Sequence, residues 1–169
     1  MNVLIVMGGL PGTGETTLAR LLTARIGAVH LRVDTIEQAI VRSGLAQHPR
    51  RPGGLRRRIR PGRGASAQGL TLIAESVNPL SVTRDAWRAT AVGAGVPVLD
   101  VEVVCSDPAE HRLRVTSRSV GIPDLPLPNW QQVVDREYEP WDRKRVVVDT
   151  AGQEPRESLA ALLARLRSH

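Results

Sequence analysis

The sequence predicts an α/β fold in three layers, with a central parallel sheet of five strands and helices on both of its faces. Short apolar runs without polar alternation, typical of strands buried on both sides, alternate along the chain with segments whose apolar residues recur at helical spacing. The apolar residues are almost all aliphatic, and phenylalanine is absent from the sequence. A chain of 169 residues can bury one sheet-centred core, so we expect residues 1–169 to form a single domain.

The amino-terminal elements follow from this pattern in order. The apolar run 2–7 is followed at once by two glycines, which predicts a buried strand leading into a tight turn. Residues 15–26 place leucines and an isoleucine at helical spacing, so the turn opens a helix. The run 28–33 predicts a second strand, and 35–43 predicts a helix that stops at Gly44.

The elements of the central part come after residue 69. The pattern predicts a strand at 70–74, a helix at 81–92 and a strand at 96–105. The sequence Ser106-Asp107-Pro108 then starts a helix over 107–118, because aspartate is a preferred cap and proline is favoured in a first helical turn.

The carboxyl-terminal part supplies the remaining elements. A proline-rich stretch at 119–129 predicts a loop, and a short helix is expected at 130–138. Residues 146–148 form the fifth expected strand, and 155–167 form a closing helix with four leucines on one face. Strands that alternate with helices favour right-handed crossovers and a parallel sheet.

A glycine-rich loop follows the first strand. Residues 9–16, Gly-Leu-Pro-Gly-Thr-Gly-Glu-Thr, match the phosphate-binding pattern G-x-x-x-x-G-K-[ST] except for Glu15 at the lysine position. In such a loop, backbone N–H groups and the helix N-terminus surround phosphate oxygens, and Thr16 supplies a hydroxyl to Mg²⁺. The expected phosphate-binding residues are Gly9, Leu10, Pro11, Gly12, Thr13, Gly14, Glu15, Thr16 and Thr17.

Glu15 changes the electrostatics of this loop. The lysine of the pattern reaches the β- and γ-phosphates and balances charge, whereas glutamate points a carboxylate towards a polyanion. At ~4–5 Å and an effective dielectric constant near 20, one such repulsion is about 3–4 kcal/mol. We therefore expect weak nucleotide binding and inefficient phosphoryl transfer. An acid in a first helical turn also stabilises the helix, and both effects can operate together.

Four segments together resemble the small P-loop kinases of the adenylylsulfate kinase, gluconate kinase and chloramphenicol phosphotransferase type, and bacterial ATP-binding proteins of the AAA family. They are residues 8–22 (GGLPGTGETTLARLL), 33–37 (VDTIE), 74–87 (AESVNPLSVTRDAW) and 105–118 (CSDPAEHRLRVTSR). The resemblance covers nearly the whole chain apart from 49–68, and it implies the P-loop kinase fold.

The resemblance also implies roles for residues outside the loop. Asp34 matches the acid that orients or deprotonates the acceptor hydroxyl, although an aspartate there can equally cap the following helix. Glu75 matches the acid that contacts Mg²⁺, where relatives more usually have aspartate. The lid-like region 118–130 and its preceding helix provide phosphoryl-clamping arginines, some of which can instead face solvent. These arginines are Arg112, Arg114 and Arg118, and the adenine edge is expected at Ala151 and Gly152.

The positive charge is confined to one segment. The formal net charge is +6, but residues 50–63 hold seven arginines and no acid, so the rest of the chain carries −1. This part of the atypical Arg/Gly/Pro-rich stretch 47–69 is interpreted as a surface loop, with a phosphate- or nucleic-acid-binding arm and the product of a compensated frameshift as alternatives. No aromatic residues interleave the arginines, so a nucleic-acid partner is not favoured.

The sequence predicts a cytoplasmic protein. It has no apolar stretch of 18 residues and no charged leader, which argues against a membrane span or a signal peptide. The one cysteine, Cys105, has no partner in the chain and is expected to be a buried strand residue.

The function expected from these features is ATP- and Mg²⁺-dependent transfer of the γ-phosphoryl group to a hydroxyl of an unidentified small molecule, with Glu15 weakening the activity. The alternatives are a degenerate relative that binds nucleotide weakly or not at all, and a basic nucleic-acid-associated protein acting through residues 50–63.

Overall fold

The structure, a computed structural model, describes residues 2–43, 69–119 and 121–167. A parallel sheet of five strands forms its centre, in the order β2-β3-β1-β4-β5. The strands are β1 (Leu4–Gly8), β2 (Val29–Arg32), β3 (Leu72–Glu75), β4 (Val98–Val104) and β5 (Val146–Asp149). Because all five run in the same direction, their carboxyl ends meet at one edge of the sheet, where ligand sites of open α/β folds form.

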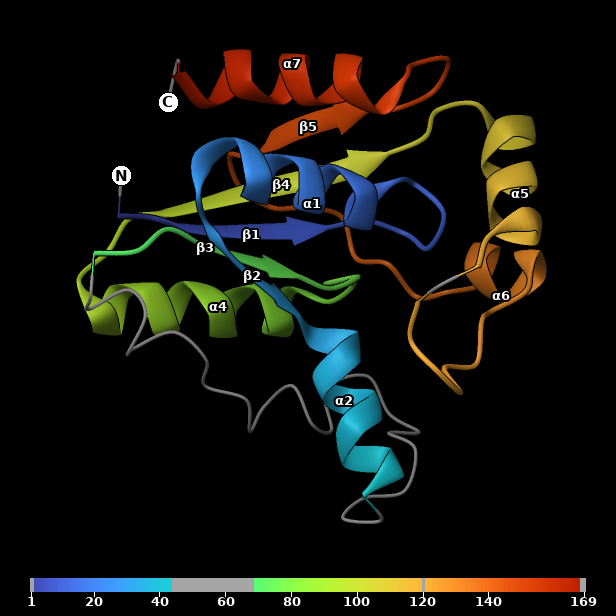
Figure 1. The fold of residues 1–169 in the computed structure, drawn as a ribbon, viewed down its shortest axis with the longest axis horizontal. Coiled ribbons are helices and arrows are strands. Elements are labelled where there is room, and N and C mark those ends of the chain that lie inside the picture. The colour runs from blue at the N-terminus through green and yellow to red at the C-terminus, as the bar shows by residue number, and fades with distance from the viewer. Residues whose placement is uncertain (1, 44–68, 120, 168–169) are drawn as a thin grey trace.

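Helices cover both faces of this sheet (Figure 1). The helices α1 and α7 pack on one face, α4 packs on the other, and α2 projects away from the sheet beyond the end of β2. At the carboxyl edge, α5 and α6 lie together. The helices are α1 (Glu15–Ile26), α2 (Val33–Arg42), α4 (Ser81–Ala94), α5 (Pro108–Ser117), α6 (Trp130–Val134) and α7 (Pro155–Arg167).

The core is divided by the sheet into two aliphatic clusters. On the α1/α7 face, alternate β1 residues such as Ile5 and Met7 pack with Leu22 and Leu162. On the α4 face, Leu4 and Val6 pack with Trp87 and neighbouring aliphatic residues. The strands are therefore buried on both sides, which explains why their sequences lack polar alternation.

The three-layer α/β architecture predicted from the sequence is confirmed, with three local differences. The helix expected at 130–138 ends at Val134, with Asp135 as its C-cap residue. Beyond it, Glu139 is bonded to the start of α4: its N–H donates to the Pro79 carbonyl at 2.8 Å and its carboxylate accepts from the Ser81 N–H at 2.6 Å. Cys105 lies just beyond β4 and is partly exposed, so the expectation of a buried strand residue is wrong.

The third difference concerns Asp34. The second helix begins at Val33, with Arg32 in the cap position and no side-chain capping bond, so Asp34 lies inside the first turn and is not the cap. Most of the stretch 47–69, with its arginine segment 50–63, lies outside the described residues. Among the described residues, no helix combines the length and apolar character needed to cross a bilayer.

Candidate functional site

The glycine-rich loop turns back between β1 and α1 through two glycines with positive φ. Gly12 has φ 91° and Gly14, in the N-cap position of α1, has φ 95°. Residues other than glycine adopt such φ values only at a cost in free energy. A Cβ atom on Gly12 would lie 2.6 Å from Cγ2 of Val115, and one on Gly9 would lie 2.5 Å from the Val103 carbonyl oxygen. Glycine is therefore required by the backbone path at Gly14, by close neighbours at Gly9 and by both at Gly12.

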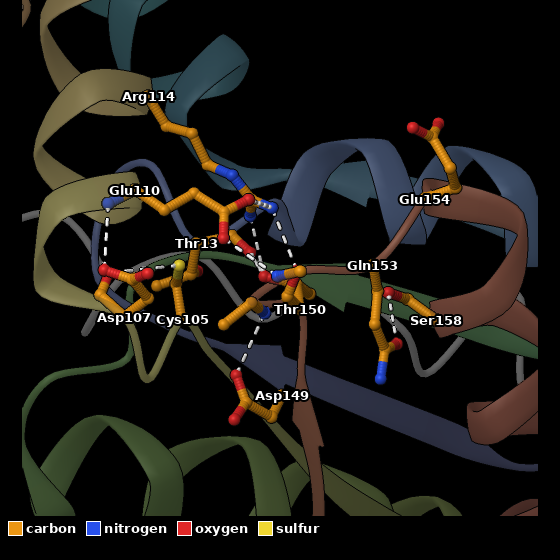
Figure 2. A network of polar contacts seen from close by, with 12 residues as sticks. Thr13, Cys105, Asp107, Glu110, Arg114, Asp149, Thr150, Gln153, Glu154 and Ser158 are labelled. Atoms are coloured by element: carbon orange, nitrogen blue, oxygen red, sulfur yellow. Dashed lines mark hydrogen bonds and ion pairs between the residues drawn. The ribbon is translucent and has the colours of Figure 1, made fainter.

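A network of polar contacts fixes the loop to the ends of β4 and β5 (Figure 2). The Thr150 hydroxyl donates to the Thr13 carbonyl at 2.7 Å, and Arg114 donates to the hydroxyl and carbonyl of Thr150 at 2.8 and 2.9 Å. The Glu110 carboxylate accepts from Arg114 at 2.5 Å and from the Gly152 N–H at 2.8 Å. One connected set of bonds thus joins the glycine loop, α5 and the segment after β5.

Helix α5 braces the same loop from the outside. A His111 ring nitrogen lies 2.9 Å from the Pro11 carbonyl oxygen, and the His111 ring packs edge-on against Trp130 of α6. The predicted cap is confirmed: the Asp107 carboxylate accepts from the N–H groups of Ala109 and Glu110 at 2.8 and 3.2 Å. The cap holds the first turn of α5, from which Glu110 reaches the network.

Asp149 ends β5 beneath this network. The Ser106 side chain and then the backbone N–H groups of Ala151 and Ser106 hold the pKa of the Asp149 carboxyl below its ordinary value. The partly buried Cys105 thiol lies nearby, and burial raises its pKa. Cys105 is therefore not activated as a nucleophile.

Thr16 and Glu75 are brought together at the carboxyl end of β3. The Thr16 hydroxyl donates to Oε1 of Glu75, while Oε2 lies 2.6 Å from a His30 ring nitrogen and Oε1 lies 3.5 Å from Nε of Arg32. A hydroxyl and a carboxylate are the hard oxygen ligands that Mg²⁺ prefers, and Mg²⁺ commonly completes its shell with water and phosphate. The donor chemistry of this pair fits Mg²⁺. No cluster of three or more His, Cys, Asp or Glu side chains able to hold a metal occurs among the described residues.

The main cavity is a space of about 790 Å³ in front of the glycine loop. It is bordered by loop residues, by Glu75, by Asp34 and Glu37 of α2, and by residues 117–119, 121 and 125–128. Of the predicted site residues, those that line it are Leu10, Pro11, Gly12, Gly14, Glu15, Thr16, Thr17, Asp34, Glu75, Arg114 and Arg118.

Five predicted residues do not line the main cavity. Gly9 and Thr13 lie behind it, where Thr13 is buried and bonded to Thr150. Arg112 is exposed on the solvent face of α5. Ala151 and Gly152 also stand outside the lining, and the following residues Gln153 and Glu154 border the cavity instead.

Arg118 brings buried and uncommitted hydrogen-bond donors to this cavity. Its Nε and Nη2 atoms are buried and have no hydrogen-bond partner. Burial, and secondarily repulsion from Arg136, lower its pKa, while Asp34 acts in the opposite direction. Arg118, Arg136 and Asp34 are thus close enough to interact, and an anion between the two guanidinium groups would satisfy the free donors.

Sequence reasoning missed Arg136, together with Arg20 and Arg32, which also border the cavity. Arginine is abundant in this chain, with only one lysine among its 23 basic residues, so none of these three differs from its surroundings in sequence. They meet at this cavity only in the folded chain, because Arg32 ends β2, Arg20 lies in the second turn of α1 and Arg136 follows α6.

Glu15 borders the cavity at the first turn of α1. Its negative charge contributes to the raised pKa of Tyr138, which burial, the largest cause, together with Glu102 brings to about 12. The Tyr138 hydroxyl donates to Glu102 at 3.3 Å and accepts from the Trp141 indole at 3.0 Å. The carboxylates of Glu15 and Glu102 therefore act on the same phenol.

Comparisons with known proteins agree with this architecture. A family model described as "AAA domain" matches residues 4–140. Among solved structures, a gluconokinase from Sinorhizobium meliloti has a TM-score of 0.70 at 17% identity, covering 99% of this chain and 93% of that one. No curated protein matches the chain in sequence.

Two further solved structures share the fold. A putative kinase from Chloroflexus aurantiacus has a TM-score of 0.66 at 20% identity, covering 99% of this chain and 97% of that one. The APS kinase of Mycobacterium tuberculosis, solved in complex with AMPPNP and APS, has a TM-score of 0.65 at 16% identity and 98% coverage of both chains. At these identities the likeness establishes a common P-loop kinase fold.

Proposed function

Because this chain belongs to the AAA domain family and has the P-loop kinase fold, we propose that it binds ATP and transfers the γ-phosphoryl group to a hydroxyl of a small molecule, at a rate limited by Glu15. The observation that carries this proposal is the single cavity that joins the glycine loop to Asp34 and Arg118. Phosphate-binding backbone, a carboxylate able to act as a base and an unsatisfied guanidinium all face one space. This is the set of groups that phosphoryl transfer needs.

The roles of the residues follow from their positions. Backbone N–H groups of residues 12–16, at the positive end of α1, hold the phosphates of the donor nucleotide. Asp34 accepts the proton of the acceptor hydroxyl, and Arg118 stabilises the charge that develops on the transferring group. Thr16 and Glu75 are the residues that would hold Mg²⁺, which neutralises phosphate charge when bound.

Glu15 is the feature that sets the level of activity. Its carboxylate borders the space in which the phosphates lie, and a repulsion of about 3–4 kcal/mol corresponds to a loss of more than ~100-fold in affinity. The same charge supports a second candidate: a catalytically degenerate relative that binds nucleotide weakly or not at all. Both candidates share the cavity and differ in the measured affinity for nucleotide.

The test is calorimetric titration of Mg·ATP into the unmodified chain and into Glu15→Lys. We expect weak binding by the former and binding tighter by more than ~100-fold in the latter, because the substitution removes a repulsion and adds an attraction. Glu137→Lys is a matched control: it makes the same change of charge at an exposed residue that does not line the cavity, and it should leave the affinity unchanged.

Two outcomes would contradict the proposal. Tight binding by the unmodified chain would refute the electrostatic role of Glu15, and no binding by either chain would refute the nucleotide site itself. If Glu15→Lys binds, phosphoryl transfer can then be sought with candidate acceptors, using Asp34→Asn as the variant that keeps binding and loses turnover.

A further inference from the structure

A second cavity of about 340 Å³ lies beside the main one, between α1, the end of β2, α2 and residues 121–123. The two cavities share Arg20, Arg32 and Gly121 in their linings, so they are neighbours on either side of a wall made largely of side chains. The phosphoryl transfer proposed for the main cavity does not use this second cavity.

Helix α2 divides the two cavities through its two faces. Asp34 and Glu37 line the main cavity, whereas Thr35, Gln38 and Arg42 line the second one. The buried Gln38 side chain donates to the Asp124 carbonyl at 3.1 Å, which fixes the 121–124 segment against α2. Two of the elements that border the second cavity, α2 and the 121–124 segment, are therefore bonded to each other.

The lining of the second cavity is strongly cationic. It includes Arg20, Arg32, Arg42 and His30, and no acidic side chain. The acids that pair with these groups lie outside the lining: Glu75 contacts His30 and lies 3.5 Å from Arg32, and the exposed Asp124 lies 4.0 Å from Arg42. Neither acid neutralises all three guanidinium groups.

Two of the arginines retain free donor capacity. Arg20, exposed on α1, forms no ion pair or side-chain hydrogen bond with any part of the chain that the structure describes. The Nε atom of Arg32 is buried without a hydrogen-bond partner. A guanidinium nitrogen that is buried without a hydrogen bond is costly, and an anionic ligand in the cavity would add an acceptor to the ion pair that Arg32 makes with Glu75 at 3.5 Å.

We propose that the second cavity is an anion site for a phosphate-class dianionic group carried by the acceptor, with Arg20, Arg32 and Arg42 as its ligands. This assignment of the substrate class rests on the proposed function, in which the acceptor's hydroxyl is placed beside Asp34. Asp34 lines the main cavity, on the other side of Arg20 and Arg32. A volume of about 340 Å³ suits a small polar group and excludes a macromolecule. Three guanidinium groups without an acid in the lining favour a dianion over a monocarboxylate.

The experiment uses the full chain, with inorganic phosphate as the probe and acetate as the monoanionic comparison, followed by NMR. The Nε–H signals of Arg20 and Arg42 report on the second cavity, and the backbone N–H signals of Gly12 and Gly14 report separately on the glycine loop. The variants are Arg20→Gln and Arg42→Gln. The matched control is Arg25→Gln, which removes the same charge from the exposed last turn of α1.

We expect phosphate to shift the Arg20 and Arg42 signals saturably, and more tightly than acetate does. Each cavity variant should weaken the response of the remaining arginine signal about tenfold, because each removes a charge-assisted hydrogen bond. Arg42→Gln should leave the glycine signals unchanged, because Arg42 lines only the second cavity. Arg25→Gln should leave both responses unchanged.

The proposal is overturned if phosphate shifts only the glycine signals, if Arg25→Gln weakens the response as much as the cavity variants do, or if acetate binds as tightly as phosphate. The failure of the anion site and the failure of the nucleotide site are distinguishable. If phosphate shifts the arginine signals in a chain that never binds Mg·ATP, the anion site is supported and the nucleotide site is refuted.

Discussion

On the loop side of the main cavity, formed by residues 9–17, 110–114 and 149–153, Arg114 and Thr150 are bonded to each other and Thr150 to the Thr13 carbonyl, whereas on the α2 side two buried nitrogen atoms of Arg118 have no hydrogen-bond partner. The α2 side consists of Arg32, Asp34, Arg118 and Arg136. On the loop side, the single hydroxyl of Thr150 donates to the Thr13 carbonyl and accepts from Arg114.

This difference separates two ways of building a binding site. The loop side already has its final geometry, so its bonds contribute to the stability of the free protein. The α2 side has donors that only a ligand can complete, so it contributes to recognition and little to stability.

Replacing Gly12 with alanine should give the largest loss of stability. The substitution strains a residue at φ 91° and drives a Cβ to 2.6 Å from Val115, for a combined cost of about 3 kcal/mol. Gly152→Ala is the matched control, because Gly152 has φ 65° and nothing within 4 Å of the added Cβ, so only about 1 kcal/mol is expected. Urea denaturation measures both, and equal losses would show that the loop is not tightly packed against α5.

Removing an arginine should have different effects on the two sides. Arg114→Met deprives the Thr150 carbonyl and the Glu110 carboxylate of their donor and should cost about 2 kcal/mol of unfolding free energy. Arg118→Met removes buried nitrogen atoms that have no partner, and its cost should stay within about 0.5 kcal/mol. Chemical denaturation of the two variants under identical conditions checks this, and a larger loss from Arg118→Met would reverse the comparison.

The cap of α5 should contribute a smaller amount. Asp107→Ala removes an acceptor from two helical N–H groups and should lower the unfolding free energy by about 1 kcal/mol. Asp107→Asn should restore most of this loss, because asparagine caps as well as aspartate. Thermal denaturation of the three chains tests whether the cap, and not the negative charge, supports the loop side.

The smallest effect concerns the acid within the loop. Tyr138 is the one tyrosine of the chain, so its phenolate absorbance can be followed alone, and it should titrate near pH 12 in the folded protein. Folding raises this pKa above its ordinary value of about 10, so the tyrosine's contribution to stability is complete below pH 10 and is lost as the pH rises towards 12.

Glu15→Gln should lower the pKa of Tyr138 slightly, because Glu15 is the smallest of the named causes that raise it. Spectrophotometric titration of both chains measures the change, with the denatured protein as the reference for an ordinary tyrosine and Tyr138→Phe as the blank. An unchanged midpoint would mean that the Glu15 carboxylate does not act on this phenol.

Much of the loop side could be predicted from the sequence, because its signals are local. The spacing of Gly9, Gly12 and Gly14 between an apolar run and a helical pattern predicts the turn, and the Asp107-Pro108 pair predicts the start of α5. The strand end that carries Glu75 could be located for the same reason.

The α2 side could be predicted only in part, because it depends on contacts between distant segments. Asp34 was expected at the boundary of strand and helix, and tertiary packing starts the helix at Val33 instead. Arg136 carries no local signal, since it meets Arg118 only through the path of the chain after α6. The pairing of Thr16 with Glu75 could be predicted, because the carboxyl ends of parallel strands meet at one edge of the sheet. The contact of His30 with the same carboxylate could not.

The wall between the two cavities has a consequence for the evolution of selectivity. Because Arg20 and Arg32 border both spaces together with Gly121, the size of the compartment open to a ligand depends in large part on two long side chains. Shortening either of them would merge two small chambers into one large one without disturbing the sheet. A scaffold divided in this way can accept a bulkier molecule through a single codon change, and it can return to a small one through the reverse change.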